Sequence, residues 1–254
     1  MNGSPSTTSP GWPTNWPADS FRNVWTWVLL GAFVIVLGFV IALSFALAPQ
    51  LAHVSSSQVN RPVFIAGLAT QAFFEAGAVA IVLAALPRLS KLSLRELGFR
   101  TPSASTLAIA VGGALAMTVV ANGLATLIDT VLHSKHEQDA VQILQMLRDP
   151  VTLGVFIVYA VVLAPFFEES LFRIFVFNVG LRFGGFWAGA IASGVLFGLA
   201  HGDLYAAVPL ALGGMILCYV YYRTRNAWAS MISHGLFNAI SILGLLLAPG
   251  LFAN

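Results

Sequence analysis

Long apolar segments alternate with short polar or charged ones along most of the chain. Seven of the apolar segments approach or exceed the roughly 20 residues that a helix needs to cross a bilayer, and turn-forming or charged residues bound each of them. They are residues 25–48, 63–86, 105–132, 151–181, 186–202, 206–222 and 227–247. The pattern predicts an all-α fold, a polytopic transmembrane helix bundle of about seven spans.

The first residues of the chain have a different character. Residues 1–20 are rich in Ser, Thr, Pro and Gly and contain neither a basic residue nor an apolar run, so they bury too little surface to offset the entropy of ordering. We expect a disordered polar tail at 1–20 and one membrane-embedded helical domain at 21–254. The first apolar segment ends in Ala46-Leu47-Ala48, which resembles a signal-peptidase cleavage site. The segment is too long for a signal peptide, however, lacks a basic n-region before Arg22, and is followed directly by Pro49. It is interpreted as a retained helix.

Basic residues indicate the orientation, because Lys and Arg concentrate in short cytoplasmic loops. The loops that would share the side of the N-terminus hold most of them: Arg22, Arg88, Lys91, Arg95, Arg100, Arg182, Arg223 and Arg225. The opposite loops hold Arg61, Lys135 and Arg148. We therefore predict a cytoplasmic N-terminus and a C-terminus on the other side.

One loop has a helical pattern of its own. Residues 134–137 have the Ser-x-x-Glu spacing of a capping box, and apolar residues follow at helical spacing until Pro150. We expect a short helix in the outer interface, with a lid over a cavity as the alternative.

Composition narrows the class of protein further. Hydrophobic residues make up 58% of the chain and charged ones 9%, and the mean hydropathy is +0.85, which excludes an ordinary soluble domain. A net charge of +2, thinly spread, offers no basic face for nucleic acid. The single cysteine, Cys218, excludes an internal disulfide and a cysteine-rich metal cluster. The expected partners are the lipid bilayer and a peptide or membrane-protein substrate, not nucleic acid.

The fourth apolar segment contains three ionisable residues: Glu168, Glu169 and Arg173. Such residues at mid-bilayer cost about 2.5 to 3.5 kcal/mol each, so they usually have a task. The four-residue spacing of Glu169 and Arg173 predicts an ion pair on one helical face, whereas Glu168 is turned about 100° away. A purely structural charge cluster is the alternative interpretation.

Two further polar pairs lie in later spans. Phe197 and His201, and His234 and Asn238, each share a helical face through i, i+4 spacing. Counting about 1.5 Å per residue from the cytoplasmic ends places Glu168, His201 and Asn238 roughly 20 to 22 Å deep, with His234 one turn lower. We therefore expect these side chains to meet in one layer.

In chain order, residues 168–173 read EExxxR, 197–201 read FxxxH and 234–238 read HxxxN. Over roughly residues 101–247, with the motifs in 151–240, the chain resembles the CAAX prenyl protease and bacteriocin-processing family (CPBP, or Abi) of intramembrane endopeptidases. The resemblance implies that Glu168 and His201 activate a water molecule, that His234 and Asn238 stabilise the oxyanion, and that Glu169 and Arg173 brace the helix. Phe197 belongs to the second motif and is expected to support the site.

Several alternatives stay open at this stage. Glu168, His201 and His234 could instead hold zinc, although we favour a mechanism without metal or other cofactor. A transporter or a non-enzymatic immunity scaffold would also contain intramembrane acids. Glu75, one turn after Gln71, either lines the substrate cavity or pairs with a neighbouring helix, and we favour pairing. The short tail and compact loops fit a bacterial plasma membrane at least as well as the endoplasmic reticulum.

Overall fold

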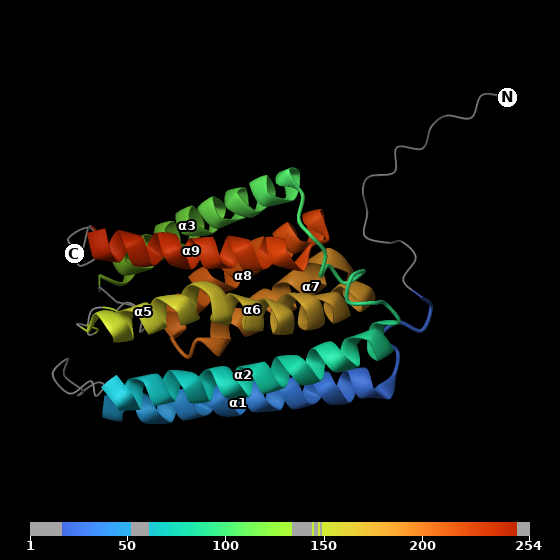
Figure 1. The fold of residues 1–254 in the computed structure, drawn as a ribbon, viewed down its shortest axis with the longest axis horizontal. Helices are drawn as coiled ribbons and strands as arrows, with labels where there is room; N and C mark the ends of the chain where they lie inside the picture. Colours follow the sequence, from blue (N-terminus) through green and yellow to red (C-terminus); the bar gives the residue numbers. More distant parts are fainter. Residues whose placement is uncertain (1–16, 52–60, 134–143, 145–146, 148, 248–254) are drawn as a thin grey trace.

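The computed structural model describes residues 17–51, 61–133, 144, 147 and 149–247. These residues form helices and no strand (Figure 1). In chain order the helices are α1 (Val24–Leu51), α2 (Arg61–Ser90), α3 (Ala104–Leu132), α5 (Pro150–Val158), η2 (Tyr159–Leu163), α6 (Ala164–Glu169), η3 (Ser170–Phe177), α7 (Asn178–Ala200), α8 (Leu204–Thr224) and α9 (Ala227–Leu247). The predicted all-α bundle is confirmed.

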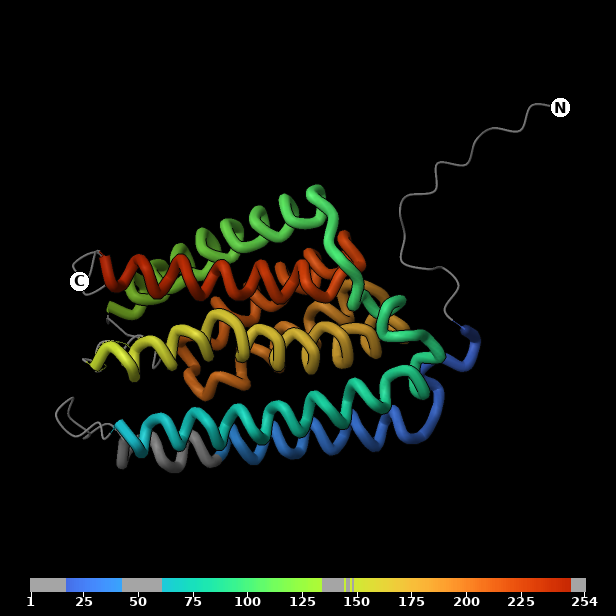
Figure 2. Tube along the Cα trace, in the orientation of Figure 1, coloured from blue at the N-terminus to red at the C-terminus, as the bar shows by residue number. Residues whose placement is uncertain are grey.

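Among the described residues, six helical segments are long and apolar enough to cross a membrane. One of them, Pro150–Ala200, has 51 residues, far more than one crossing needs. It folds back at Gly185, whose backbone is left-handed (φ 75°, ψ −174°), and the close approach of Gly180 to Gly189 shows that its two arms run side by side. Figure 2 shows this reversal between the yellow and orange parts of the chain. The arms correspond to the predicted segments 151–181 and 186–202, so six long segments make about seven passes.

The first arm is helical throughout but changes its winding. Over η2 and η3 the helix is widened to π geometry. At η2 the N–H of Ala164 donates to the carbonyl of Tyr159, five residues back, and the next residue is Pro165, which has no N–H to donate. The carbonyl of Ala160 is therefore left without a donor from its own helix and is available to a neighbouring helix.

The ends of several helices are tied together at one end of the bundle. The N–H of Phe21 donates to the carbonyl of Leu89, and that of Ala227 donates to the carbonyl of Gly98. Arg182 Nη2 donates to the carbonyl of Ala18, 3.3 Å away. The loops predicted to be cytoplasmic thus share one end of the molecule, as their alternation along the chain requires.

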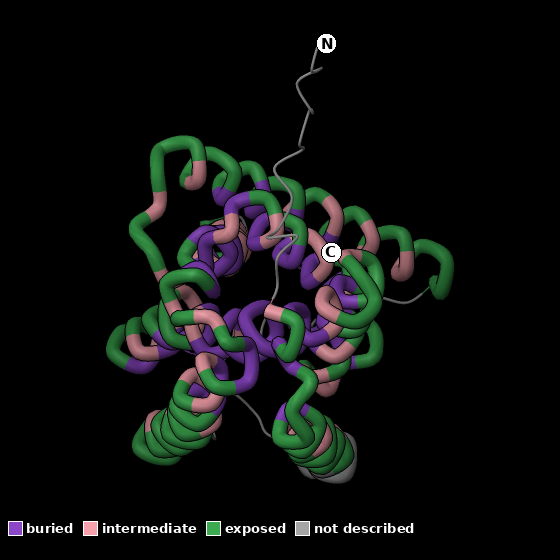
Figure 3. Tube along the Cα trace, turned by 90° about the vertical axis from the view of Figure 1, so that its right-hand side faces the viewer, coloured by how far each residue is buried: buried purple, intermediate pink, exposed green. Residues whose placement is uncertain are grey.

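Burial is unequal among the helices. The centre of the bundle is buried and the outer faces are exposed (Figure 3), because an apolar exterior suits the lipid. Just over half of the apolar window of α8, 56%, is buried, against 6% of that of α1. The three motif-bearing segments, 164–177, α7 and α9, pack around α8 and hold the site inside the bundle.

Two predicted features fall mostly outside the described residues. Of the tail at 1–20, only 17–20 are described, and Ser20 is ordered there, its hydroxyl donating to the carbonyl of Ser90 at 2.5 Å. Of the predicted interfacial helix at 134–147, only Leu144 and Leu147 are described, and both pack in a small apolar cluster with Phe156 and Ile242.

Candidate active site

The ion pair of the first motif, Glu169 with Arg173, lies buried beneath the other motif side chains. Arg173 Nη1 lies 3.0 Å from Glu169 Oε1, and both side chains are fully buried. Arg173 Nη2 also donates to the backbone carbonyl of Gly214 on α8, at 3.2 Å. The predicted ion pair is present, and it joins the first arm to α8.

His234 connects the two glutamates. Its Nδ1 lies 3.0 Å from Glu169 Oε1, and its Nε2 lies 3.8 Å from Glu168 Oε2. Because Glu169 is paired with Arg173 and so accepts only, Nδ1 donates this bond. Nε2 then lies on the side of Glu168. This arrangement, an imidazole held by a carboxylate on one nitrogen and open on the other, fixes both the ring orientation and the tautomer.

Phe197 lies at the centre of the motif side chains. Its ring, 1% exposed, makes edge contacts with His201 and His234 at centroid distances of 4.9 and 5.5 Å. On the other side the Arg173 guanidinium lies 4.3 Å from the ring centre, a cation–π contact. Phe197 therefore contacts both histidines, as a residue that supports the site would.

His201 ends α7 and lies at the edge of this cluster. Its Nδ1 is 2.8 Å from the carbonyl of Phe197, and a carbonyl only accepts, so Nδ1 donates this bond. The residue is exposed. No hydrogen bond or ion pair joins His201 to Glu168 in the described structure, and the expectation that the two hold a water molecule together stays a prediction.

Asn238 lies one turn beyond His234 on α9. Its Nδ2 donates to the carbonyl of Ala160 at 2.7 Å, the carbonyl that the π geometry and Pro165 deprive of a helical donor. This bond uses one of the two amide hydrogens and leaves the other available. Asn238 thus joins α9 to the π-helical part of the first arm.

Sequence reasoning did not foresee how close α7 and α8 come. A methyl group at Gly198 would overlap the carbonyl oxygen of Ala207, and one at Gly194 would lie 2.6 Å from that of Ala211. Gly214 likewise leaves room for the Arg173 guanidinium, 3.2 Å from where a Cβ would be. The four-residue spacing of Gly194 and Gly198 is the signal that could have predicted this contact.

Glu75 on α2 has partners outside the motifs. Its Oε2 accepts from the Tyr159 hydroxyl at 2.7 Å, and its Oε1 accepts from Gln71 Nε2 at 3.1 Å. The predicted pairing with a neighbouring helix is confirmed. Tyr159, which begins η2, was not foreseen as the partner.

The metal alternative requires three converging ligands. Across the described residues, no group of three or more His, Cys, Asp or Glu side chains is arranged to hold a metal ion. Glu168, Glu169 and His234 converge, but Glu169 is occupied by Arg173 and His201 stands apart. Whether Glu168, His201 and His234 hold zinc stays a prediction.

Comparison with known proteins supports the motif-based resemblance. Residues 150–240 match the family model described as Type II CAAX prenyl endopeptidase Rce1-like, and all three motifs lie within that segment. The resemblance to this family is confirmed for residues 150–240, about a third of the chain, in an integral membrane protein.

One curated relative extends the same finding. The Bacillus subtilis (strain 168) protein named "Putative membrane peptidase YdiL" is 25% identical over 87 residues, which are 34% of this chain and 36% of that protein. The match thus spans about a third of the relative's length. No solved structure matches the chain.

Proposed function

We propose that this membrane protein is an endopeptidase that hydrolyses a peptide bond near the C-terminus, or in a membrane segment, of a peptide or membrane-protein substrate. The observation that carries the proposal is the facing pair of Glu168 Oε2 and His234 Nε2, 3.8 Å apart inside the bundle. The family match and the peptidase name of the relative support the same reaction class. Buried Glu–His pairs also occur in the proton relays of transporters, so the cleavage test below separates the two functions.

Glu168 serves as the general base. Its Oε2 is buried and accepts no hydrogen bond from a described residue, so it can accept one from a water molecule. In the reaction the water oxygen bonds to the substrate carbonyl carbon while its proton passes to Glu168. The C–N bond then breaks, and the proton passes to the leaving amine.

The two histidines have more closely defined roles than the resemblance alone implies. Glu168 and His201 were expected to share the water and His234 to stabilise the oxyanion. The geometry favours His234 as the imidazole nearest the water, because its Nε2 lies 3.8 Å from Glu168 Oε2. In this mechanism Nε2 accepts the proton that Glu168 took from the water, donates to the developing oxyanion together with the remaining N–H of Asn238, and then passes the same proton to the leaving amine. His201 then completes the opposite wall of the site.

No step of this mechanism passes through a metal. The brace formed by Glu169, Arg173 and Phe197 keeps the His234 ring fixed and supplies the buried charge balance. A buried carboxylate that is ion-paired with a guanidinium and bonded to an imidazole holds both groups in place.

The test is Glu168→Gln in the purified full-length protein, with a membrane-peptide library as substrate. The amide keeps the shape but is a poor base, so cleavage should fall at least about a hundredfold while insertion and melting temperature stay unchanged. Glu96→Gln is the matched control, because Glu96 is an exposed loop residue. A Glu168→Gln rate above about a tenth of the wild-type rate removes Glu168 as the base, and no cleavage by the wild-type protein removes the protease.

A further inference from the structure

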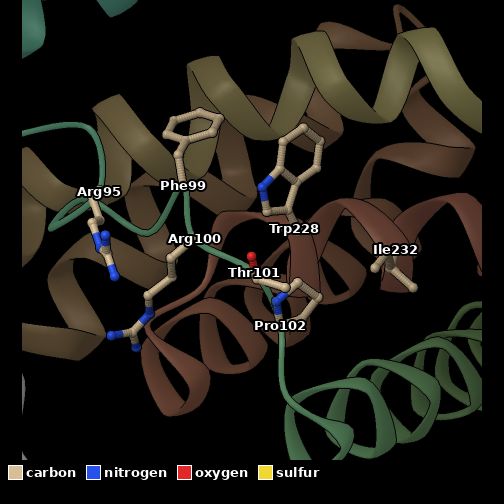
Figure 4. Close-up of a pocket in the computed structure, with 7 residues that line it drawn as sticks. All are labelled: Arg95, Phe99, Arg100, Thr101, Pro102, Trp228 and Ile232. Atoms are coloured by element: carbon tan, nitrogen blue, oxygen red, sulfur yellow. The ribbon is translucent and has the colours of Figure 1, made fainter.

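A cavity lies at the end of the bundle that holds the loops predicted to be cytoplasmic, away from the motif side chains. It has a volume of about 720 Å³ and is lined chiefly by Arg95, Phe99, Arg100, Trp228 and Ile232. Figure 4 shows the two guanidinium groups at one end of the cavity, Ile232 at the other, and the two aromatic rings between them. None of these residues has a role in the proposed hydrolysis.

The rim of the cavity is held rigidly. Gly98 has a left-handed backbone (φ 111°), and a side chain there would lie 2.8 Å from the Ala227 nitrogen, so only glycine lets this loop lie against the start of α9. The Ala227 N–H donates to the Gly98 carbonyl. Asn226 Nδ2 donates to the carbonyl of Arg100 at 2.8 Å. The two arginines therefore extend from a fixed loop.

The positive charge of the cavity is not neutralised within the described residues. Neither Arg95 nor Arg100 forms an ion pair with any of them, and Arg100 makes one side-chain hydrogen bond, from Nη2 to the carbonyl of Thr224 at 3.1 Å. The nearest acid in the sequence, Glu96, instead accepts from the N–H and hydroxyl of Ser93, which lowers its pKa. Most of the guanidinium N–H groups remain free to bind an anion.

The other end of the cavity is apolar and leads into the membrane. Trp228 is held between two rings, edge-on to Phe99 at 6.0 Å and stacked on Phe166 at 6.2 Å. Ile232 follows one turn further along α9, about 6 Å deeper. An exposed tryptophan at the first turn of a spanning helix belongs at the level of the lipid head groups.

We propose that this cavity binds the phosphate of an anionic phospholipid head group. Arg95 and Arg100 hold the phosphate oxygens, and the upper acyl chain lies along Trp228 and Ile232. A free phosphate would use the charged end only, whereas a lipid matches both ends, and juxtamembrane arginines attract anionic lipids by about 1 kcal/mol each. The lipid is taken from the leaflet that contacts this end of the bundle.

The experiment measures lipid binding to the purified full-length protein in a nonionic detergent by native mass spectrometry. Phosphatidylglycerol should bind at least about tenfold more tightly than phosphatidylcholine. The double variant Arg95→Gln and Arg100→Gln should remove that preference. A matched control, Arg88→Gln with Arg223→Gln, makes the same charge change with basic residues of the last turns of α2 and α8 and should keep it.

Three results would overturn the proposal. They are equal binding of the two lipids, equal weakening in the control variant, and displacement of phosphatidylglycerol by inorganic phosphate at equal concentration, which would make the cavity a phosphate site. If the double variant melts early, Arg95→Gln alone decides, because that side chain bonds to no described residue. It should weaken phosphatidylglycerol binding about fivefold, and an unchanged affinity would refute the lipid site.

Discussion

At the scale of single residues, Glu169 has a different task from its neighbour Glu168, although the two adjoin in sequence. Glu169 is ion-paired with Arg173, lies within hydrogen-bond distance of His234 and is fully buried, whereas the Glu168 side chain is 22% exposed and faces His234 Nε2. One helical step of about 100° is enough to separate a structural carboxylate from the one that we propose as the base.

This division of roles predicts how the variants will differ in stability. Arg173→Ala leaves Glu169 buried without its cation, a loss of about 3 to 5 kcal/mol, so the melting temperature in detergent should fall well below that of Glu168→Gln. The double variant Glu169→Gln with Arg173→Met removes both charges and should be milder than Arg173→Ala alone. Equal melting temperatures for Arg173→Ala and Glu168→Gln would contradict the bracing role.

The sequence predicted these residues well where the interaction is local. The four-residue spacing of Glu169 and Arg173 was sufficient to predict their ion pair, because helix geometry alone brings them together. Which histidine faces Glu168 depends on how α7 and α9 are rotated about their own axes where they pack at Phe197. Side-chain packing of that kind has no signature in residue spacing, so the separate roles of His201 and His234 came from the family resemblance and not from the spacing.

At the scale of elements, the irregular helix around Pro165 connects the first arm of Pro150–Ala200 to α9. The widened turn exposes the Ala160 carbonyl, and Asn238 takes it. Gly235 allows this approach, since a Cβ there would lie 2.5 Å from the Val161 carbonyl oxygen. The predicted span at 151–181 contains Pro165, but the sequence does not say whether a proline kinks, widens or ends a helix.

The glycine contact between α7 and α8 predicts a second set of variants. Gly198→Ala should destabilise the protein by about 1 to 3 kcal/mol, because the methyl group overlaps the Ala207 backbone and pushes α7 outward. Cleavage should fall as well, since α7 carries Phe197 and His201. The comparison is thermal unfolding and peptide cleavage in the same detergent.

The control for this pair is Gly112→Ala on α3, where an added Cβ meets nothing within 4 Å. Alanine is the better helix former by up to about 1 kcal/mol, so this variant should be neutral or slightly more stable. If Gly198→Ala behaved like the control, close packing of α7 on α8 would not be what positions the second motif.

At the scale of the whole molecule, composition and hydropathy were enough to predict the membrane class and the bundle. The boundaries also agree closely, and the predicted last span, 227–247, coincides with α9. The fold-back at Gly185 lies between the predicted segments 151–181 and 186–202. The different exposure of α1 and α8 could not be predicted, because it depends on which faces meet, and an apolar face looks the same in sequence whether lipid or another helix covers it.

The molecule as purified can also distinguish the two ways in which these residues could activate water. In the structure both Nδ1 atoms lie within hydrogen-bond distance of fixed acceptors, an arrangement that ligating histidines also adopt because it leaves Nε2 for the metal. Without metal, the protein should contain less than stoichiometric zinc and keep most of its activity after prolonged chelation, because Glu168 and His234 act unaided. With a zinc ligand set of Glu168, His201 and His234, chelation should silence the enzyme and added zinc should restore it. His234→Asn gives the second measurement, since an amide can donate to an oxyanion but is a poor zinc ligand. We expect partial activity and no change in zinc content, whereas complete loss together with stoichiometric zinc in the wild type only would make this site a metal centre.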